Sequence, residues 1–282
     1  MAIPKVAAIH DLSGLGKCSL TSAIPILAAM GVQACPLPTA ALSNQTGFQS
    51  FSCVDLTDYM SPFAHEWKKQ GVQFDGIYTG FLNDLRQVKI TEDFIKDFRT
   101  PHTLVLIDPV LGDNGHLYPV FDQAMSQRIK QLIRYGDIIT PNLTEACLLT
   151  DSDYKIYSSF TDISPFWHLA QQLAEIGPKI VVISGIHQGA NICNLAYDAR
   201  DNSRFIVKNR RIGANFSGTG DILAAILCGG LVRKQPLKTI LEKAALLLEK
   251  AVDETCTEQT DPNEGIAFEN YLYLLMGKEL SI

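Results

Sequence analysis

Short apolar runs rich in β-branched residues alternate along this chain with longer segments whose apolar residues recur at helical spacing. Residues 6–10, 76–80 and 104–108 are typical of buried strands, and a segment of helical period follows each of them. A helix between two strands carries the chain back along the sheet, so that the next strand runs in the same direction. The sequence therefore predicts a mainly parallel sheet flanked by helices.

The pattern continues to the end of the chain with one interruption. Residues 191–197 and 203–208 flank a polar turn, which predicts a β-hairpin, and the late segments 221–232 and 263–276 have helical period. No repeat, low-complexity tract or long linker divides the 282 residues. We therefore expect one domain that spans residues 1–282, a length that a large α/β domain reaches.

The formal charge of the chain restricts its partners. The net charge is −6 at pH 7, whereas nucleic-acid or anionic-membrane binding needs a basic face. This charge does not exclude ATP, because backbone N–H groups and a few local cations hold phosphates. The seven cysteines stand singly without a CxxC pair, and no apolar run approaches the roughly 20 residues of a membrane-spanning helix. We expect a cytoplasmic protein with reduced thiols and neither nucleic acid nor membrane as a partner.

Polar residues stand at the carboxyl ends of five predicted strands, where ligands bind in open parallel sheets. Polar residues also end strands for structural reasons, but five such ends on one rim favour an active site. The five segments are His10-Asp11, Thr79-Gly80, Asp108-Pro109, Thr140-Pro141-Asn142 and Ser184-Gly185. Of the six histidines, His10 is the one at this rim.

Residues 215–221, Asn-Phe-Ser-Gly-Thr-Gly-Asp, lead directly into an apolar helix. The Gly-Thr-Gly part lets the backbone approach a ligand closely, and the start of the helix favours an anion. Such an anion hole suits phosphoryl transfer, in which charge spreads over the oxygens of the moving phosphoryl group. Asp221 stands beside this hole, where its carboxylate can accept a proton from an attacking hydroxyl. The alternative is that Asp221 only caps the helix.

Two further clusters combine acids with turn residues. Asp108 and Asp113 flank a Pro/Gly-rich turn, where they either hold Mg²⁺, directly or through water, or satisfy the turn itself. Asn142 and Glu145 stand three residues apart on one helical face. They either project together toward a ligand or form an N-cap with its capping-box acid. The residues alone leave both choices open.

Two common nucleotide-binding motifs do not occur in the sequence. Residues 11–18, Asp-Leu-Ser-Gly-Leu-Gly-Lys-Cys, are only superficially like a GxxxxGK[ST] phosphate loop, because the glycine spacing differs and Cys follows the Lys. The same segment lacks the GxGxxG spacing of dinucleotide-binding proteins. We expect this loop to contact a small polar substrate instead.

Five segments, in the same order, resemble the pyridoxal kinase branch of the ribokinase superfamily over nearly the whole chain. They are Ser-Asn-Gln-Thr-Gly at 43–47, Tyr-Thr-Gly-Phe at 78–81, Asp-Pro-Val-Leu-Gly-Asp at 108–113, Ile-Thr-Pro-Asn-Leu-Thr-Glu at 139–145 and Gly-Thr-Gly-Asp at 218–221. The resemblance implies a three-layer α/β/α ribokinase-like fold with a mainly parallel central sheet, and a homodimer. It also implies ATP, Mg²⁺ and a monovalent cation, K⁺ or Na⁺, as cofactors.

The resemblance implies a role for each matching residue. Asp221 matches the base that deprotonates the substrate's hydroxymethyl group, and the anion hole consists of Gly218, Thr219 and Gly220. The residues that match ATP contacts are Asp108, Asn142, Ser184, Thr219 and Tyr118, the last of them in a flap over ATP. The residues that match metal contacts are Asp113, Glu145 and Thr140. The substrate is expected to contact Asp11, Ser13 and Thr46.

Two departures from the family pattern bear on the substrate. Asp11 stands where pyridoxal kinases commonly carry a serine, and its loop resembles that of the hydroxymethylpyrimidine kinases of thiamine synthesis. Gln45 replaces a histidine that is common in the pyridoxal branch. If Asp11 points into the site, its carboxylate accepts hydrogen bonds from a donor on the ligand. The alternative is that it braces the turn at residues 13–16 through backbone N–H groups.

The expected function is the transfer of the ATP γ-phosphate to the 5-hydroxymethyl oxygen of a B6 vitamer, namely pyridoxal, pyridoxine or pyridoxamine. The alternative that the first loop favours is a kinase of hydroxymethylpyrimidine or its phosphate. The missing GxGxxG argues against a nucleotide-dependent oxidoreductase. The full set of carboxylates argues against a non-catalytic sensor.

Overall fold

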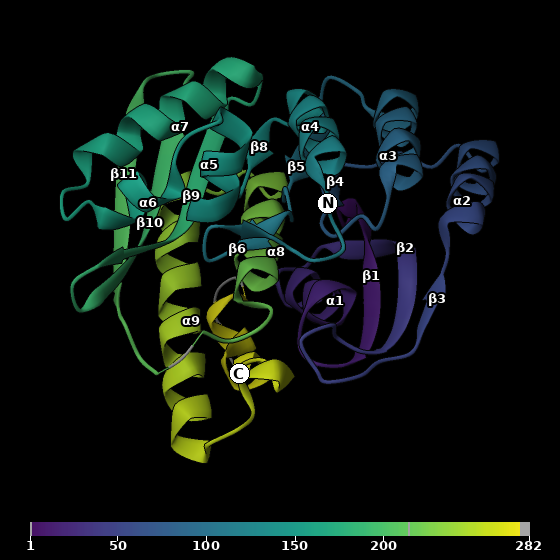
Figure 1. The fold of residues 1–282 in the computed structure, drawn as a ribbon. Coiled ribbons are helices and arrows are strands. Elements are labelled where there is room, and N and C mark those ends of the chain that lie inside the picture. The colour runs from purple at the N-terminus through teal and green to yellow at the C-terminus, as the bar shows by residue number, and fades with distance from the viewer. Residues whose placement is uncertain (1, 214, 277–282) are drawn as a thin grey trace.

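The computed structural model describes residues 2–213 and 215–276. Within these ranges, the strands of the main sheet are β1 (Lys5–Leu15), β2 (Gln33–Asn44), β3 (Cys53–Asp55), β4 (Gly76–Thr79), β5 (Leu104–Ile107), β8 (Ile138–Ile139), β9 (Ile180–Gln188), β10 (Asn191–Asp198) and β11 (Ser203–Arg210). Their order across the sheet is β11-β10-β9-β8-β5-β4-β1-β2-β3 (Figure 1). The strands from β2 to β9 in this order run parallel, whereas β3, β10 and β11 pair antiparallel with their neighbours.

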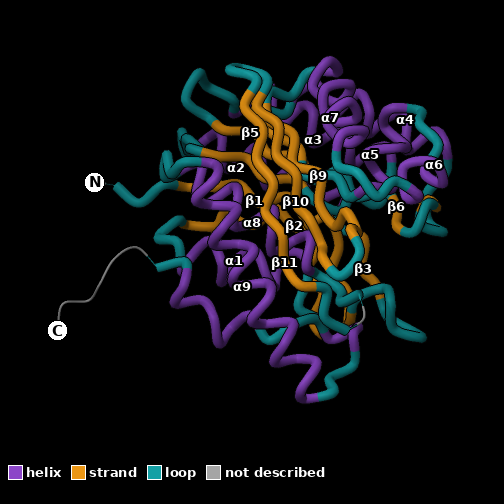
Figure 2. Tube along the Cα trace, turned by 90° about the vertical axis from the view of Figure 1, so that its left-hand side faces the viewer, coloured by secondary structure: helices purple, strands orange, loops and turns teal. Residues whose placement is uncertain are grey.

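Helices cover both faces of the sheet. One group consists of α2 (Thr57–Lys69), α3 (Leu85–Phe98), α4 (Gln123–Leu132), α5 (Leu143–Thr150), the short α6 (Tyr154–Ser159) and α7 (Ser164–Ile176), and the other of α1 (Ser19–Ala29), α8 (Thr219–Val232) and α9 (Leu237–Glu258). Figure 2 shows the strands between α4, α5 and α7 on one side and α1 and α9 on the other. The predicted three-layer fold with a mainly parallel sheet is confirmed. In the part of the chain that the structure describes, no helix is both long and apolar enough to cross a bilayer.

Two hydrophobic cores, one on each face of the sheet, hold the layers together. Successive side chains of a strand point to opposite faces. In β1, Ala7 and Ile9 join the core beneath α3, α4, α5 and α7, while Val6 and Ala8 join the core beneath α1, α8 and α9. A strand buried on both faces needs apolar residues at consecutive positions, which explains the short continuous apolar runs of the sequence. Each fully buried isoleucine contributes about 1.5–3 kcal/mol to folding.

β1 and β2 are longer than the sequence predicts. The apolar run of the first strand stops at His10, but β1 continues to Leu15 with a register shift between His10 and Leu12. The sequence predicts too short a β2 because it contains Pro36 and Pro38. Proline has no N–H to donate to a neighbouring strand and seldom occurs within a sheet. They are tolerated because this part of β2 pairs with β1 alone, and β3 joins its other side only farther along.

The carboxyl-terminal segment corrects one prediction. The helix expected over residues 263–276 is wrong, since the chain forms two short 3₁₀ helices there, η2 (Pro262–Glu264) and η3 (Phe268–Leu274). Gly265 lies between them with φ +84°, a conformation that no helix continues through. The hairpin expected over residues 191–208 is confirmed, because β10 and β11 pair antiparallel along their whole length.

Candidate active site

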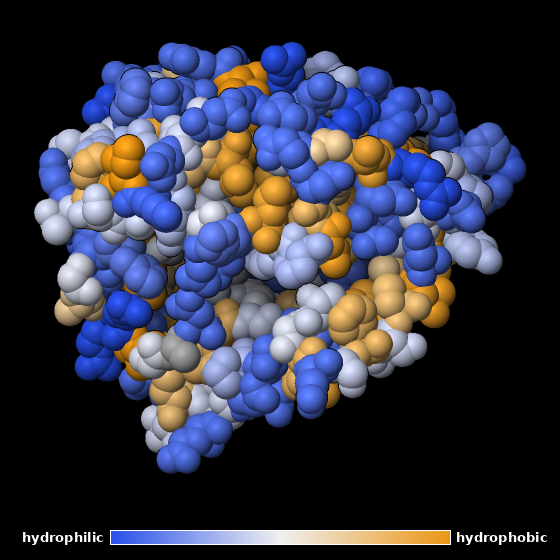
Figure 3. All heavy atoms as spheres, in the orientation of Figure 1, coloured by the Kyte–Doolittle hydropathy of each residue, from blue (hydrophilic) through white to orange (hydrophobic). Residues whose placement is uncertain are grey.

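The start of α8 lies beside the residues that precede α1. Gly218, directly before α8, has φ +80°, which favours glycine. A β-carbon there would overlap the backbone carbonyl oxygen of Lys17, so the two segments pack without space between them. Figure 3 shows a hollow in the middle of the molecule, where Figure 1 places the start of α8.

The first turn of α8 leaves room for a ligand. A β-carbon on Gly220 would meet no atom within 4 Å among the described residues. The first N–H groups of a helix have no partner in their own helix, and the helix dipole adds positive charge at this end. The geometry around Gly218, Thr219 and Gly220 is therefore suited to a phosphate group.

Asp221 is held by residues from β1 and α1. Its Oδ1 lies 2.9 Å from Nε2 of His10, and its Oδ2 accepts a hydrogen bond from the backbone N–H of Ser19 at 2.9 Å. These two contacts orient the carboxylate. The Asp221 side chain is 15% exposed, so the carboxylate still reaches solvent. Within the described residues, neither oxygen bonds to an N–H of its own helix, which disfavours the helix-capping alternative.

Asp11 is buried and bonded entirely within the protein. It accepts hydrogen bonds from the hydroxyls of Ser13 at 2.8 Å and Ser19 at 2.6 Å, and its Oδ1 lies 3.0 Å from Nδ1 of His10. Burial raises the pKa of Asp11, but the hydrogen bonds from His10, Ser19 and Ser13 outweigh it and lower the pKa. Asp11 therefore braces its surroundings, but in the described residues it does so through the hydroxyls of Ser13 and Ser19 and not through the backbone N–H groups that the bracing alternative predicts.

Thr46 lies in the loop after β2 and is exposed. Its neighbour Gln45 is buried, and its side-chain amide donates to the backbone oxygen of Asn263 at 3.1 Å. The Gln45 side-chain oxygen accepts from the N–H of Gly47 at 2.6 Å. The residue that replaces a family histidine therefore ties this loop to η2.

Asp108 and Glu145 are two buried carboxylates close to one another, and Asp108 also lies near Asp221. The hydroxyl of Thr140 donates to Asp108 at 2.9 Å. Burial, followed by the charge of Asp221, raises the pKa of Asp108 to about 7. Burial and the charge of Asp108 raise the pKa of Glu145 well above its usual range. Carboxylates that repel one another in this way are stabilised by a bound cation.

Asn142 and Glu145 form the capping box of α5. The Glu145 carboxylate accepts from the N–H of Asn142 at 2.8 Å, and the Asn142 side-chain oxygen accepts from the N–H of Glu145 at 2.9 Å. The N–H of Leu111 also donates to Glu145, at 3.1 Å. The capping alternative is confirmed. It leaves lone pairs on the Glu145 oxygens for water or a metal ion.

A magnesium ion fits this donor set when it arrives with a nucleotide. Among the described residues, no group of three or more His, Cys, Asp or Glu side chains could hold a metal by itself. Mg²⁺ is commonly held by phosphate oxygens, waters and only one or two carboxylates. Asp108, Thr140 and Glu145 offer only oxygen ligands, as Mg²⁺ prefers. Asp113 is exposed in the small hairpin of β6 (Gly112–Asp113) and β7 (His116–Leu117).

The structure also brings two of the predicted ATP contacts to this edge of the sheet. Ser184 of β9 forms an isolated parallel bridge with Asn142. Tyr118 follows β7, and burial together with the charge of Glu145 raises the pKa of its phenol. Tyr118 therefore lies near the Glu145 carboxylate, and Ser184 lies beside Asn142, the residue that caps α5.

The comparisons with known proteins decide the family. Residues 23–265 match the model of the phosphomethylpyrimidine kinase family. The chain belongs to this family. The structure of a Bacteroides thetaiotaomicron protein assigned as a phosphomethylpyrimidine kinase superposes with a TM-score of 0.95 at 41% identity, covering 99% of this chain and 96% of that one.

Pyridoxal kinases are also similar to this member of the family. The Lactobacillus plantarum enzyme superposes with a TM-score of 0.87 at 30% identity and covers 97% of each chain. The pyridoxal kinase of Dictyostelium discoideum is 26% identical over an alignment of 277 residues, which covers 89% of this chain and 86% of that protein. The predicted resemblance to pyridoxal kinases and to hydroxymethylpyrimidine kinases is confirmed, as is the prediction that the protein is a kinase.

Sequence reasoning did not assign roles to two residues that contact Asp221. His10 was notable only for its position at the rim. Ser19 has φ +54°, a strained conformation for a residue with a side chain, and no sequence pattern reveals it. The neighbouring Cys18 is not a reactive thiol, because burial raises its pKa to about 12 and keeps it protonated at neutral pH.

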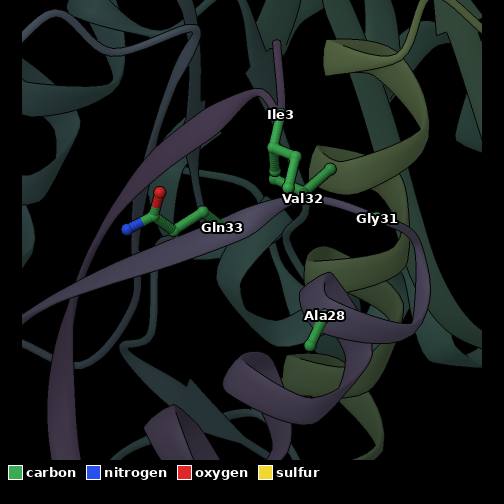
Figure 4. Close-up of a pocket in the computed structure, with 5 residues that line it drawn as sticks. All are labelled: Ile3, Ala28, Gly31, Val32 and Gln33. Atoms are coloured by element: carbon green, nitrogen blue, oxygen red, sulfur yellow. The ribbon is translucent and has the colours of Figure 1, made fainter. Parts of the chain in front are cut away.

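A second hollow lies at the opposite edge of the sheet. Figure 4 shows its lining residues, which are Ile3, Ala28, Gly31, Val32 and Gln33. Gln33 is the first residue of β2, so this hollow is at the amino ends of the strands. The polar residues described above are at the carboxyl ends, and the hollow is not part of the candidate site.

Proposed function

We propose that this family member is an ATP-dependent kinase that phosphorylates the 5-hydroxymethyl group of a B6 vitamer. One observation carries the proposal: the Bacteroides thetaiotaomicron relative was crystallised with pyridoxal, in a form that superposes with a TM-score of 0.92 at 42% identity and covers 97% of this chain. A pyridoxal kinase of the same fold, from Leishmania donovani, was solved with ADP and pyridoxamine. These ligands support ATP as the phosphate donor here.

In the proposed reaction, Asp221 acts as the base. The vitamer's hydroxymethyl oxygen forms a bond to the γ-phosphorus of ATP and gives its proton to the Asp221 carboxylate, while the bond from that phosphorus to ADP breaks. The N–H groups of Gly218, Thr219 and Gly220 stabilise the charge on the moving phosphoryl group. The partly exposed Asp221 then returns the proton to solvent.

The remaining residues are proposed to hold ATP, its metal and the substrate. Mg²⁺ and a monovalent cation would neutralise phosphate charge beside Asp108, Asp113, Thr140 and Glu145. The proposed nucleotide contacts are Asp108, Asn142, Ser184, Thr219 and Tyr118. Thr46 is the proposed substrate contact, whereas the internal hydrogen bonds of Asp11 and Ser13 favour a role in shaping the first loop.

An ADP-release assay across candidate substrates tests the function. We expect turnover of pyridoxal, pyridoxine and pyridoxamine, each dependent on ATP. A kinase of hydroxymethylpyrimidine or its phosphate is the second candidate, because the family to which the chain belongs is named for phosphomethylpyrimidine kinase and the residues around Asp11 resemble those of hydroxymethylpyrimidine kinases. If kcat/KM for hydroxymethylpyrimidine exceeds that for all three vitamers, the second function replaces the first.

Glu145→Gln is expected to raise the Mg²⁺ concentration needed for half-maximal activity by about tenfold, as losses of metal-supporting groups typically do. The amide keeps the shape and one acceptor for the N–H groups of Asn142 and Leu111 but removes the charge. The measurement is a Mg²⁺ titration at saturating ATP and pyridoxal, with the exposed Glu66→Gln on α2 as the matched control. If the curves of Glu145→Gln and wild type overlay, Glu145 only caps α5.

We also propose that the protein is a homodimer whose contact includes the far ends of β1, β2 and β3. Leu12 is paired with Ala41, and Ala41 with Val54, so the three lie side by side on one face of the sheet. Leu12 is 41% exposed and Val54 58%, which leaves an apolar strip without cover. Val54→Glu is expected to reduce the molar mass in light scattering to that of a monomer. A wild-type protein that is already monomeric contradicts the proposal.

The single domain and the cytoplasmic location stay predictions.

A further inference from the structure

The ring of His10 lies between two carboxylates, that of Asp11 in β1 and that of Asp221 in the first turn of α8. It is 2% exposed, with Nε2 at 2.9 Å from Asp221 Oδ1 and Nδ1 at 3.0 Å from Asp11 Oδ1. A buried imidazole in contact with two acids is not needed for packing, because an apolar side chain fills such a space without polar partners. The contact joins the first strand to α8 directly beside the reacting groups.

The donors around His10 determine which nitrogen carries a proton. The backbone N–H groups of Asp11 and Phe81 point at Nδ1, at 3.0 and 3.2 Å. In the neutral ring, Nδ1 accepts these bonds and the proton is on Nε2, whereas in the charged ring Nδ1 also carries a proton and donates it to Asp11 Oδ1. Burial lowers the pKa of His10, but the carboxylates of Asp221 and Asp11 raise it to about 10. In both the neutral and the charged ring, Nε2 therefore donates its proton to Asp221.

Two further features are consistent with a site built around this contact. Gly80 has no β-carbon, and one placed there would overlap the His10 ring. Ser19, with its strained φ of +54°, joins the same two acids by a second route: its N–H donates to Asp221 and its hydroxyl to Asp11. Strained residues persist where the surrounding structure holds them, commonly at functional sites.

We propose that His10 is a positioning residue that orients the Asp221 carboxylate for proton abstraction, with Asp11 and Ser19 holding the arrangement in place. This inference rests on the proposed function, in which Asp221 is the base. His10 Nε2 and the Ser19 N–H each donate a hydrogen bond to a different oxygen of Asp221. These two bonds fix the plane of the carboxylate, and lone pairs remain on its oxygens to accept the proton of the substrate hydroxyl. The other titratable groups that face His10 are Tyr78, whose ring is edge-on at 6.1 Å, and Asp108, whose pKa it lowers.

A matched pair of substitutions tests the contact. In His10→Gln, the longer side chain brings an amide donor to the place of Nε2, whereas in His10→Asn the amide reaches only the place of Nδ1. We expect His10→Asn to lower kcat for pyridoxal about 100-fold, the usual effect of a misplaced catalytic group. KM for ATP stays unchanged, and His10→Gln restores most of the rate. Gly80→Ala, which displaces the ring without removing a polar group, is expected to behave like His10→Asn.

A double mutant separates this inference from the proposed function. If His10 acts through Asp221, then His10→Asn has no further effect on kcat in an Asp221→Asn background. An equal loss in both backgrounds, or equal kcat for His10→Asn and wild type, overturns the positioning role while Asp221 remains the base. Equal losses in His10→Gln and His10→Asn, together with a lower melting temperature in both, would reduce His10 to a packing residue. Wild-type turnover by Asp221→Asn alone would instead refute the proposed function.

Discussion

Asp221→Asn is expected to lower kcat for a B6 vitamer by about 10²–10⁴-fold, the range typical for loss of a general base. The amide is close in size to the carboxylate, and its oxygen can still accept the N–H of Ser19. It cannot take up a proton from the attacking hydroxymethyl group. Nucleotide binding is expected to persist, because the N–H groups at the start of α8 are unchanged.

The measurement combines turnover with binding. ADP release with pyridoxal gives kcat, and isothermal titration calorimetry gives the Kd for ATP with Mg²⁺. Asp253→Asn is the matched control, because Asp253 is an exposed acid of α9 that contacts Arg210 outside the site. If kcat of Asp221→Asn stays within a few-fold of wild type, Asp221 is not the base. A loss of ATP binding in parallel with kcat would assign it to nucleotide binding instead.

Gly218→Ala is expected to be the most damaging of the glycine substitutions in the anion hole. Its φ of +80° costs a residue with a side chain about 1–2 kcal/mol. The new β-carbon would also overlap the Lys17 carbonyl oxygen, which is backbone and cannot rotate away. The first turn of α8 must therefore move. We expect a lower melting temperature and a fall of about 100-fold or more in kcat/KM for ATP, as misplacement of the phosphate site implies.

Gly220→Ala provides the comparison two residues away. Its β-carbon meets no protein atom within 4 Å in the described structure, and alanine stabilises a helix by about 0.5–1 kcal/mol relative to glycine. The melting temperature is expected to hold or rise while KM for ATP increases, because the methyl group occupies the space proposed for phosphate. Unchanged KM in Gly220→Ala would place the nucleotide elsewhere. Unchanged stability in Gly218→Ala would contradict the packing against Lys17.

The local sequence was sufficient for features that depend on neighbouring residues. The alternation of apolar runs with helical segments predicted the parallel sheet and its layers, because burial on two faces requires continuous apolar strands. The Asn142 and Glu145 spacing predicted a capping box as one of two alternatives, and the box is present. The Gly-Thr-Gly-Asp segment predicted a helix start, and α8 begins at Thr219.

Features that depend on distant residues were not accessible in this way. β1 continues past His10 because β2 pairs with it, although the apolar pattern has ended. The expected helix at 263–276 fails at Gly265, where a β-carbon would also meet Lys17. Asp11 appeared as a candidate ligand contact on the basis of its type and its place at a strand end. Its actual partners, Ser13, Ser19 and His10, depend on the extension of β1 past His10 and on where α1 begins.

By itself, the sequence determined the class of fold, the kinase family and the acids near the reaction, since periodicity and short motifs are properties of neighbouring residues. Only the tertiary structure decided how those acids are used. His10 and Asp221 are 211 positions apart, and they meet because the fold places His10, within β1, beside the first turn of α8. The missing β-carbon of Gly80 leaves room for the His10 ring, and Ser19, with its strained backbone, donates its N–H to the same carboxylate. No pattern of neighbouring residues predicts this contact, because it depends on how distant segments of the chain pack together.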